Sequence, residues 1–351
     1  MKPIAIYDRS TKKRLAYLEN AYDISYVKQT NSVWNASFKL PYSDYKKEYC
    51  EVLNFVEMWD VNTGNDDIYV GLFRIMEIVE RMNQTDYVIE YYLEHVMNTL
   101  LDSYILGYKE YTTSTISDVI TTILGFQNQT DWVLDVCDYS DVLYLAFEDV
   151  NILTALNNIT QLLSEDYYWE FNTQIFPWKI NLKKVSGTPI ADIRYRKNIF
   201  GLTKKLDTKS MITRLYIYGV DADGLRVDLT TVNSGLEYID SITGIADYGI
   251  ISAVINEPAI SIPDHLLTYG TALLSKLDKP FITYTADIQA INNAGNLKIG
   301  DSVRIVTEDE LDTILTVQEI RKDNVSGAPY SGKITIGKGT VELGIIVKGF
   351  I

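Results

Sequence analysis

The sequence predicts a mainly β protein with α/β inserts, and three observations support this fold class. Twenty-six Tyr, ten Phe and five Trp bring the aromatic residues to 12% of the 351-residue chain, and these rings favour the half-buried faces of sheets. Segments that alternate apolar and polar residues dominate both ends of the chain. Helical periodicity is limited to three segments between those ends.

The N-terminal strands are expected to form a meander. In Trp34–Leu40, apolar Trp, Ala, Phe and Leu alternate with polar Asn, Ser and Lys, as in a strand with one buried face. Polar turns separate neighbouring runs, which indicates antiparallel hairpins. The strands expected here are Ile4–Asp8, Arg14–Leu18, Trp34–Leu40, Phe55–Val61, Tyr69–Met82 and Tyr87–Leu93.

Three helices are expected. Thr115, followed three residues later by Asp118, approximates a capping box at the start of the first helix, and Gly125 ends it. The second helix spans Asn151–Leu163, where leucines and one isoleucine recur on one side. The third spans Pro263–Leu277, which begins with Pro and carries a leucine stripe.

Further strands are expected around these helices. Asp221-Ala-Asp-Gly224 reads as a hairpin turn in which the Gly can adopt a positive φ. Residues 233–262 are rich in Gly, Ser and Asp and read as a loop. The expected strands are Tyr167–Asn172, Trp178–Lys183, Thr213–Val220, Leu225–Val232, Phe281–Ile288, Ser302–Val306, Thr313–Arg321 and Lys333–Ile336.

Two blocks of the chain repeat the same order of elements. Residues 34–89 and 281–336 each run strand, connection, strand, acidic turn, strand, turn, strand. Met76-Glu-Ile78 and Gln318-Glu-Ile320 occupy the same place in the third strand of each block. The sequence therefore predicts an internal duplication in which the two blocks superpose.

The pattern of elements predicts four domains. Residues 1–96 form a first β-barrel, and residues 97–190 form an α/β insert. Residues 191–262 form a β-rich connecting domain. Residues 263–351 form a second β-barrel with its helix, and we expect this barrel to use strands from 191–232 as well.

Composition excludes several classes of function. A formal net charge of −15 excludes a general electrostatic attraction to nucleic acid or anionic lipid. Two His and two Cys are too few for a disulfide framework or for a zinc site with three or four His or Cys ligands. No apolar run approaches about 18 residues and the start turns polar early, so we expect neither a membrane span nor a signal peptide.

The reactive side chains suggest structural roles. His95 is expected at the start of a helix and His265 on the first turn of another, and neither has a Cys nearby in the sequence to act as a nucleophile. The sequence also has no Gly-x-Ser-x-Gly elbow. Cys50 and Cys137 are expected to be single reduced thiols.

Acidic clusters and one Gly-rich stretch are expected to be structural as well. The clusters lack the spacing of an EF-hand loop and read as solvated turns. They are Asp135, Asp138 and Asp141, then Glu308-Asp-Glu310 with Asp312, then Asp221-Ala-Asp-Gly224. Residues 332–340 approach a P-loop, but Gly339 stands where Ser or Thr is needed, and the stretch alternates like a strand. We assign no catalytic, cofactor-binding or metal-binding residue.

Five segments resemble one known family. Ile193-Arg-Tyr-Arg-Lys-Asn-Ile199, followed by Ile212-Thr-Arg-Leu-Tyr-Ile-Tyr-Gly219, resembles phage tail hub proteins of the prophage tail endopeptidase family. Tyr91–Leu101, Phe147–Leu153 and Leu297–Val303 look like the same family. Together the segments cover nearly the whole chain in the order expected of the family.

The resemblance implies a structural baseplate hub at the tip of a phage or prophage tail. It implies two tail-tube-like antiparallel β-barrels with smaller α+β domains, in a homotrimer that closes the tail tube and adapts it to a spike or fibre. The implied partners are the tail tube or distal tail protein and a spike, fibre or tape-measure protein. The implied location is the virion tail tip, after synthesis in the bacterial host cytoplasm. No enzymatic activity and no cofactor are expected, since longer members carry wall-degrading modules in an extension beyond the position of Ile351.

General physical arguments agree with a hub and leave two alternatives open. Two similar barrels in each of three chains give six positions, which match a six-fold tube. An acidic chain suits a conduit through which DNA passes without specific binding. The first alternative is a wall-degrading enzyme of the tail tip, because any two of 47 acidic residues could face each other across a substrate. The second is a carbohydrate-binding module that uses stacked Tyr rings.

Overall fold

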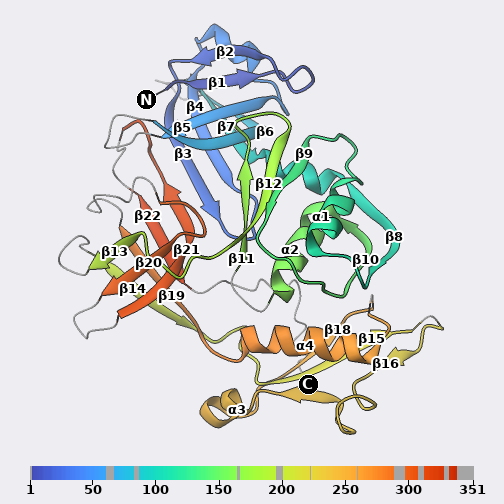
Figure 1. Cartoon of the computed structure of the whole chain (residues 1–351). Coiled ribbons are helices and arrows are strands. Elements are labelled where there is room, and N and C mark those ends of the chain that lie inside the picture. The colour runs from blue at the N-terminus through green and yellow to red at the C-terminus, as the bar shows by residue number, and fades with distance from the viewer. Residues whose placement is uncertain are drawn as a thin grey trace.

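The computed structural model describes residues 2–60, 67–82, 87–163, 167–194, 201–221, 223–258, 260–287, 297–306, 312–327 and 332–337. Its largest element is a 13-stranded sheet (Figure 1). The strands of this sheet are β1 (Ile4–Tyr7), β2 (Arg14–Leu18), β3 (Tyr22–Gln29), β4 (Asn35–Pro41), β5 (Phe55–Asp60), β6 (Ile68–Met82), β7 (Tyr87–His95), β13 (Ala191–Arg194), β14 (Leu202–Asp207), β19 (Phe281–Asp287), β20 (Ser302–Val306), β21 (Asp312–Lys322) and β22 (Lys333–Gly337).

The large sheet consists of two modules with the same strand order. In the N-terminal module the order is β3-β4-β7-β6-β5, and in the C-terminal module it is β14-β19-β22-β21-β20. Every neighbouring pair in both series is antiparallel. The two blocks predicted from the sequence therefore have one topology, as a duplication requires. The modules differ at the next strand, because β1 pairs antiparallel with β5 whereas β13 pairs parallel with β20.

A β-bulge marks the same place in both modules. Met76 is the extra residue where β6 pairs with β7, and Gln318 is the extra residue where β21 pairs with β22. A bulge bends its strand and increases the local twist, so both modules curve at this point. The sequence predicted that Met76–Ile78 would correspond to Gln318–Ile320, and the two bulges confirm that alignment.

A turn that contains a residue with positive φ is also repeated, directly before the second strand of each block. Leu53 and Gly300 both have a positive φ, 68° and 88°. The Leu53 N–H donates to the carbonyl of Ile75 at 2.8 Å, and the Gly300 N–H donates to the carbonyl of Val317 at 3.1 Å. Ile75 and Val317 are each the residue before the bulge, so the turn and the bulge form one repeated unit.

The mainly β class is confirmed, but the predicted closed barrels are not found among the described residues. The sheet is open there, with β14 at one end of its path and β2 at the other. The physical reason lies in β3, which pairs with β4 on one edge and with β21 of the other module on its second edge. The edge that would close a barrel within one module instead joins the two modules.

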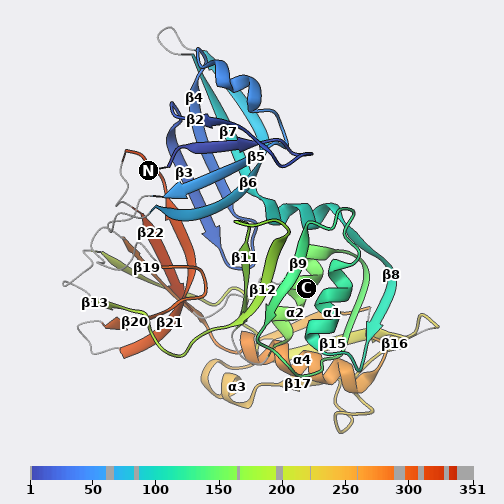
Figure 2. The same ribbon diagram turned by 45° about the horizontal axis from the view of Figure 1, so that its top comes forward.

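An α/β insert lies beside the N-terminal module (Figures 1 and 2). A two-stranded sheet pairs β8 with β10, and a three-stranded sheet has the order β11-β12-β9, with β9 parallel to β12. The helix predicted from Thr115 is present, and the Thr115 hydroxyl accepts the Asp118 N–H at 3.2 Å. The elements are η2 (Val96–Asp102), β8 (Tyr104–Tyr111), α1 (Ile116–Leu124), β9 (Trp132–Cys137), β10 (Leu145–Asn151), α2 (Ile152–Leu162), β11 (Tyr167–Asn172) and β12 (Trp178–Lys184).

A small sheet with two helices forms a separate unit, which lies at the bottom of Figure 1. Its elements are β15 (Arg214–Val220), β16 (Arg226–Val227), β17 (Tyr238–Asp240), α3 (Ile242–Tyr248), β18 (Ser252–Asn256) and α4 (Pro263–Leu277). Leucines of α4 share a buried core with Leu215 and Ile217 of β15. The sequence grouped this helix with the second barrel, whereas the structure packs it on β15 and β17.

Two local predictions in this unit were wrong. Residues 233–262 are not one loop, because they contain β17, α3 and β18. The Ser241 hydroxyl caps α3 by accepting the Gly244 N–H at 3.1 Å, so Ser and Gly in this segment belong to the start of a short helix. Further along, β18 pairs with β15. The strand predicted over Leu225–Val232 ends at Val227, because the Asp228 carboxylate accepts the Thr230 N–H at 2.9 Å and forms a turn.

The described residues bury two apolar cores. The larger one joins both modules and the insert, and the smaller one belongs to the unit of β15 and α4. The Lys276 ammonium of α4 donates to the carbonyl of Thr160 in α2 at 3.0 Å and links the two parts. No helix in the described ranges is long and apolar enough to cross a membrane. The domain boundaries at residues 96, 190 and 262 stay a prediction.

Candidate functional site at the junction of the two modules

Strand β3 joins the two modules through backbone pairing. Its C-terminal half runs antiparallel to the end of β21, with Gln29 opposite Glu319 and Tyr26 opposite Lys322. Next to this ladder, the Thr30 N–H donates to the carbonyl of Gln318 at 2.9 Å. Because Gln318 is the bulge residue, the bulge of the C-terminal module lies directly at the junction.

A buried ion pair reinforces the same junction. Asp60 ends β5, and its carboxylate Oδ2 accepts from the Lys322 ammonium of β21 at 2.6 Å and from the Tyr26 hydroxyl of β3 at 2.7 Å. The side chains of Lys322 and Asp60 are 7% and 2% exposed. Burial, with the nearby Asp60 carboxylate second, raises the pKa of Tyr26 well above its usual range, so its hydroxyl stays a donor. One carboxylate therefore holds strands from both modules.

Lys28 is a second ammonium at this junction. Its Nζ lies 4.9 Å from the centre of the Trp34 ring. Burial lowers the pKa of Lys28 from 10.5 to about 8, with Lys298 acting in the same direction and Asp60 opposing it. The junction therefore contains one lysine in an ion pair and one whose pKa is lowered to about 8.

The junction surrounds a cavity of about 330 Å³. Its wall combines residues of both modules with β11 of the insert, and five of the lining side chains are charged. Those five are Lys28, Asp60, Glu170, Lys298 and Lys322. Among the described lining residues ammonium groups outnumber carboxylates, and none of these residues is a Ser, Thr, Cys or His that would act as a nucleophile or a neutral base.

Lys28 makes stability depend on pH. The unfolded side chain has the higher pKa, so unfolding takes up a proton between about pH 8 and pH 10, and the folded chain becomes more stable as pH rises through that window. We expect Lys28 to contribute a rise of about 2 kcal/mol to the free energy of unfolding there. The buried Cys50 thiol, whose pKa is raised to about 12, acts in the opposite direction over the same window. The Lys28 contribution is therefore read as the difference between the pH profiles of the unchanged chain and of Lys28→Met, which should lack most of that rise. Denaturant unfolding monitored by Trp fluorescence measures both.

The control for this prediction is Lys109→Met, at an exposed position of β8, which should leave the rise in place. The measurement should stop near pH 10, because buried Tyr26 stays protonated in the folded chain and reverses the trend above the usual Tyr pKa. A Lys28→Met variant with an unchanged pH profile would contradict the prediction.

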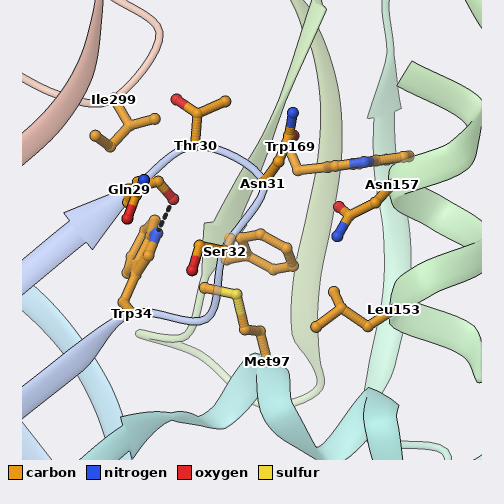
Figure 3. Close-up of a pocket in the computed structure, with 11 residues that line it drawn as sticks. Gln29, Thr30, Asn31, Ser32, Trp34, Met97, Leu153, Asn157, Trp169 and Ile299 are labelled. Atoms are coloured by element: carbon orange, nitrogen blue, oxygen red, sulfur yellow. Dashed lines mark hydrogen bonds between the residues drawn. The ribbon is translucent and has the colours of Figure 1, made fainter. Parts of the chain in front are cut away.

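A smaller pocket lies between the β3–β4 turn and the insert (Figure 3). Its volume of about 10 Å³ is too small for more than a single water. The Trp34 indole N–H donates to the carbonyl of Gln29 at 3.1 Å and closes the turn, while Asn31 faces Trp169 and Asn157 of the insert (Figure 3). This pocket is a packed joint and has no room for a ligand.

His95 lies inside the same joint. It is the last residue of β7 and the cap of η2, so the predicted helix start is a 3₁₀ turn. Its Nδ1 accepts the Met97 N–H at 3.2 Å, and its ring lies 4.6 Å from that of Trp34. Burial, and next the charge of Lys28, lower the pKa of His95 well below its usual range. A neutral, fully buried imidazole is a packing residue here.

The other reactive side chains are scattered. The His265 ring stacks on Tyr144 with 3.8 Å between ring centres. Burial raises the pKa of Cys50 to about 12, and burial also raises the pKa of half-buried Cys137. Both thiols are therefore protonated at neutral pH and lack the thiolate that nucleophilic catalysis needs.

The acidic clusters are engaged in surface contacts where the structure describes them. Asp135 pairs with Lys179 at 3.0 Å, and Asp138 accepts the Lys184 N–H at 3.1 Å. Asp221 accepts the N–H groups of its own turn. Among the described residues no three His, Cys, Asp or Glu side chains gather in a way that would hold a metal ion.

The remaining candidates lie partly outside the described residues. Residues 308–310 and 338–340 belong to that part of the chain. Within the P-loop-like stretch, residues 333–337 form β22 in the middle of the sheet, which confirms the strand interpretation of the alternation. That the chain has no catalytic, cofactor-binding or metal-binding residue stays a prediction.

The fold is that of phage tail proteins. The prophage tail protein gp18 of Listeria monocytogenes EGD-e aligns with a TM-score of 0.61 at 17% identity, over 96% of this chain and 94% of that one. A tail protein of Neisseria meningitidis MC58 aligns with a TM-score of 0.65 at 12% identity, over 96% and 97%. The E. coli protein c3393 is described as a type VI secretion component similar in structure to T4 tail proteins gp27 and gp5. It aligns with a TM-score of 0.55 at 11% identity, over 97% of this chain and 77% of that one.

A family match agrees with the fold. The family model described as prophage endopeptidase tail matches residues 188–345. This range contains three of the five segments on which the resemblance rested. One of them, residues 212–219, leads into β15 and forms most of that strand. The resemblance to phage tail proteins of this family is thereby confirmed. No curated protein matches the chain by sequence.

Proposed function

We propose that this tail protein is a structural hub of the tail tip that forms a homotrimeric ring. The observation that supports this proposal most directly is that a single chain contains two modules with the same strand order and the same bulge position. A ring of three such chains presents six similar modules, which is the symmetry needed to continue a six-fold tube. The likeness to a protein described as similar to the T4 tail proteins gp27 and gp5 supports a structural role in the tail.

The proposed partners lie on the two faces of the ring. One face meets the tail tube or a distal tail protein, and the other receives a spike, a fibre or the tape-measure protein. The chain is acidic, with a formal net charge of −15, so DNA would pass through the ring without binding to it. The proposed location is the tail tip of a phage or prophage particle assembled in the host cytoplasm.

The proposal assigns the chain no enzymatic role, although the family description contains the word endopeptidase. The described His and Cys side chains are buried, stacked or protonated and form no nucleophile with its base. Incubation with bacterial cell walls should release neither sugars nor peptides. Sustained release that a catalytic-site inhibitor abolishes would overturn this assignment.

A carbohydrate platform needs exposed rings. Some Tyr rings are exposed, such as Tyr45 at 69% and Tyr104 at 52%, but the Trp residues add little to such a surface. Four of the five Trp side chains are buried: Trp34, Trp132, Trp169 and Trp178.

The trimer is testable in solution. We expect light scattering after gel filtration to report about 120 kDa, three times the 40.0 kDa chain, with contacts above about 1,000 Å² between copies. A two-dimensional average of the particles should show a ring with three-fold symmetry. A monomer at every concentration, or a ring with another number of copies, would contradict the proposal.

A further inference from the structure

The internal repeat identifies a strand edge that lacks its counterpart. Residues 319–321 of β21 pair with β22 on one edge and with β3 on the other. The bulges align β21 with β6, so Glu319, Ile320 and Lys322 correspond to Glu77, Ile78 and Glu80. Residues 77–82 of β6 pair with β7, and among the described residues no strand lies on their other edge.

Side chains beside the covered edge of β21 are buried, whereas their counterparts beside the open edge of β6 are exposed. Gln318 and Ile320 are each 6% exposed, beside β3. Their counterparts Met76 and Ile78 are 40% and 37% exposed. The sequence has kept apolar side chains at positions that the single chain leaves open, which is typical of a surface that another chain covers.

Strand β14 is the counterpart of β3, and among the described residues one of its edges is open as well. Three strand-to-strand steps from Ile75, the residue before the bulge, lead through β7 and β4 to Tyr26 in β3. The same three steps from Val317 lead through β22 and β19 to Lys204 in β14. β14 pairs with β19 on one side and ends the path of the sheet on the other. Its Leu206 is 57% exposed.

We propose that β14 of one copy pairs antiparallel with residues 77–80 of β6 in a second copy of this chain. The pairing repeats between chains the β3–β21 ladder that joins the modules within one chain. Its register follows from the repeat: Lys204 lies opposite Glu80, Leu206 opposite Ile78 and Asp207 opposite Glu77. The inference rests on the proposed homotrimer and names the surface that forms it.

Two of the three opposite pairs are chemically complementary, and the third places the carboxylates of Asp207 and Glu77 opposite each other. Leu206 and Ile78 would cover each other on one face of the sheet, and Lys204 and Glu80 bring opposite charges together on that face. On the other face, Asp207 is already in an ion pair with Lys205 at 2.9 Å, and Lys205 would lie diagonal to Glu77. The backbone N–H and carbonyl groups of both open edges gain partners, as in β-strand addition.

The arrangement also closes on itself. Each chain has one open β14 edge and one open β6 edge, so contacts run head to tail, and head-to-tail contacts form a ring when the rotation between copies closes. Since the repeat places equivalent modules side by side, the N-terminal and C-terminal modules of three chains would alternate around the ring, six modules in all.

The test uses full-length protein carrying Ile78→Cys and Leu206→Cys. Opposite residues on antiparallel strands have Cβ atoms about 4.5–5.5 Å apart, which a disulfide can span after a small adjustment. Mild oxidation should give disulfide-linked dimers and trimers on non-reducing denaturing gels, with the trimer as the largest species. The matched control, Val79→Cys with Leu206→Cys, places the two thiols on opposite faces and should remain unlinked.

The outcomes separate this inference from the proposed function. A trimer by light scattering in which the two cysteine pairs link equally poorly would overturn the strand pairing and leave the trimer standing. A monomer at every concentration would overturn both. Linked species larger than three copies would overturn the closed ring.

A charge exchange gives a second measurement that does not depend on oxidation. Glu80→Lys and Lys204→Glu each place like charges opposite each other, and each should weaken trimer formation at least about fivefold. The two substitutions together restore an opposite-charge pair and should recover most of the loss. Equal losses that simply add in the double variant would overturn the proposed register.

Discussion

Replacing Asp60 with alanine is expected to lower the free energy of unfolding by about 3–5 kcal/mol, the largest effect of any single charge in the described residues. The substitution leaves the buried ammonium of Lys322 without the carboxylate that lies 2.6 Å away. It also removes the acceptor of the Tyr26 hydroxyl. Because an unpaired buried charge is costly, the loss reflects Lys322 more than the pair itself. Denaturant unfolding of the purified protein measures it.

Two further variants show that burial is the cause. Asp135→Ala removes the partner of Lys179, but both side chains are 40% exposed, so the expected loss is below about 1 kcal/mol. Combining Asp60→Ala with Lys322→Met also removes the unpaired Lys322 charge, and should recover part of the stability lost in Asp60→Ala. If Asp60→Ala and Asp135→Ala destabilised the protein equally, the buried ion pair would not hold the modules together.

The second large effect is expected for Gly219→Ala in β15. A Cβ at this position would lie 1.9 Å from the carbonyl oxygen of Ile260 and 3.1 Å from its carbonyl carbon. Both atoms belong to the backbone, so no side chain can rotate to make room, and the segment at Ile260 must move away from β15. We expect a loss of about 3 kcal/mol in the unit of β15 and α4, at the upper end for overpacking.

Limited proteolysis and thermal unfolding measure this change. Cleavage within residues 212–281 should become faster, while the large sheet keeps its resistance, because the two parts have separate cores. Gly187→Ala is the control, since a Cβ there meets no atom within 4 Å. Similar stabilities for the two variants would mean that the approach of Ile260 to Gly219 does not constrain the fold.

The sequence alone determined those features that depend on neighbouring residues. Pro263–Leu277 was predicted as a helix and is one, because its leucine stripe and N-terminal Pro act within single turns. Alternation in the P-loop-like stretch predicted the strand β22. The correspondence of Met76 with Gln318 was also visible, because a duplication preserves the order of residues around a bulge.

Only the tertiary structure decided how these elements meet. The strand β3 was missed, although Tyr22, Ile24 and Tyr26 alternate with polar residues as in a strand with one buried face. Its pairing with β21 opened the predicted barrels into one sheet. Asp60 and Lys322 carry no local sign of their ion pair, since each reads as a charge at the end of a strand. Contacts between residues far apart in the chain leave no periodicity in either segment, so the junction between the modules could be found only in three dimensions.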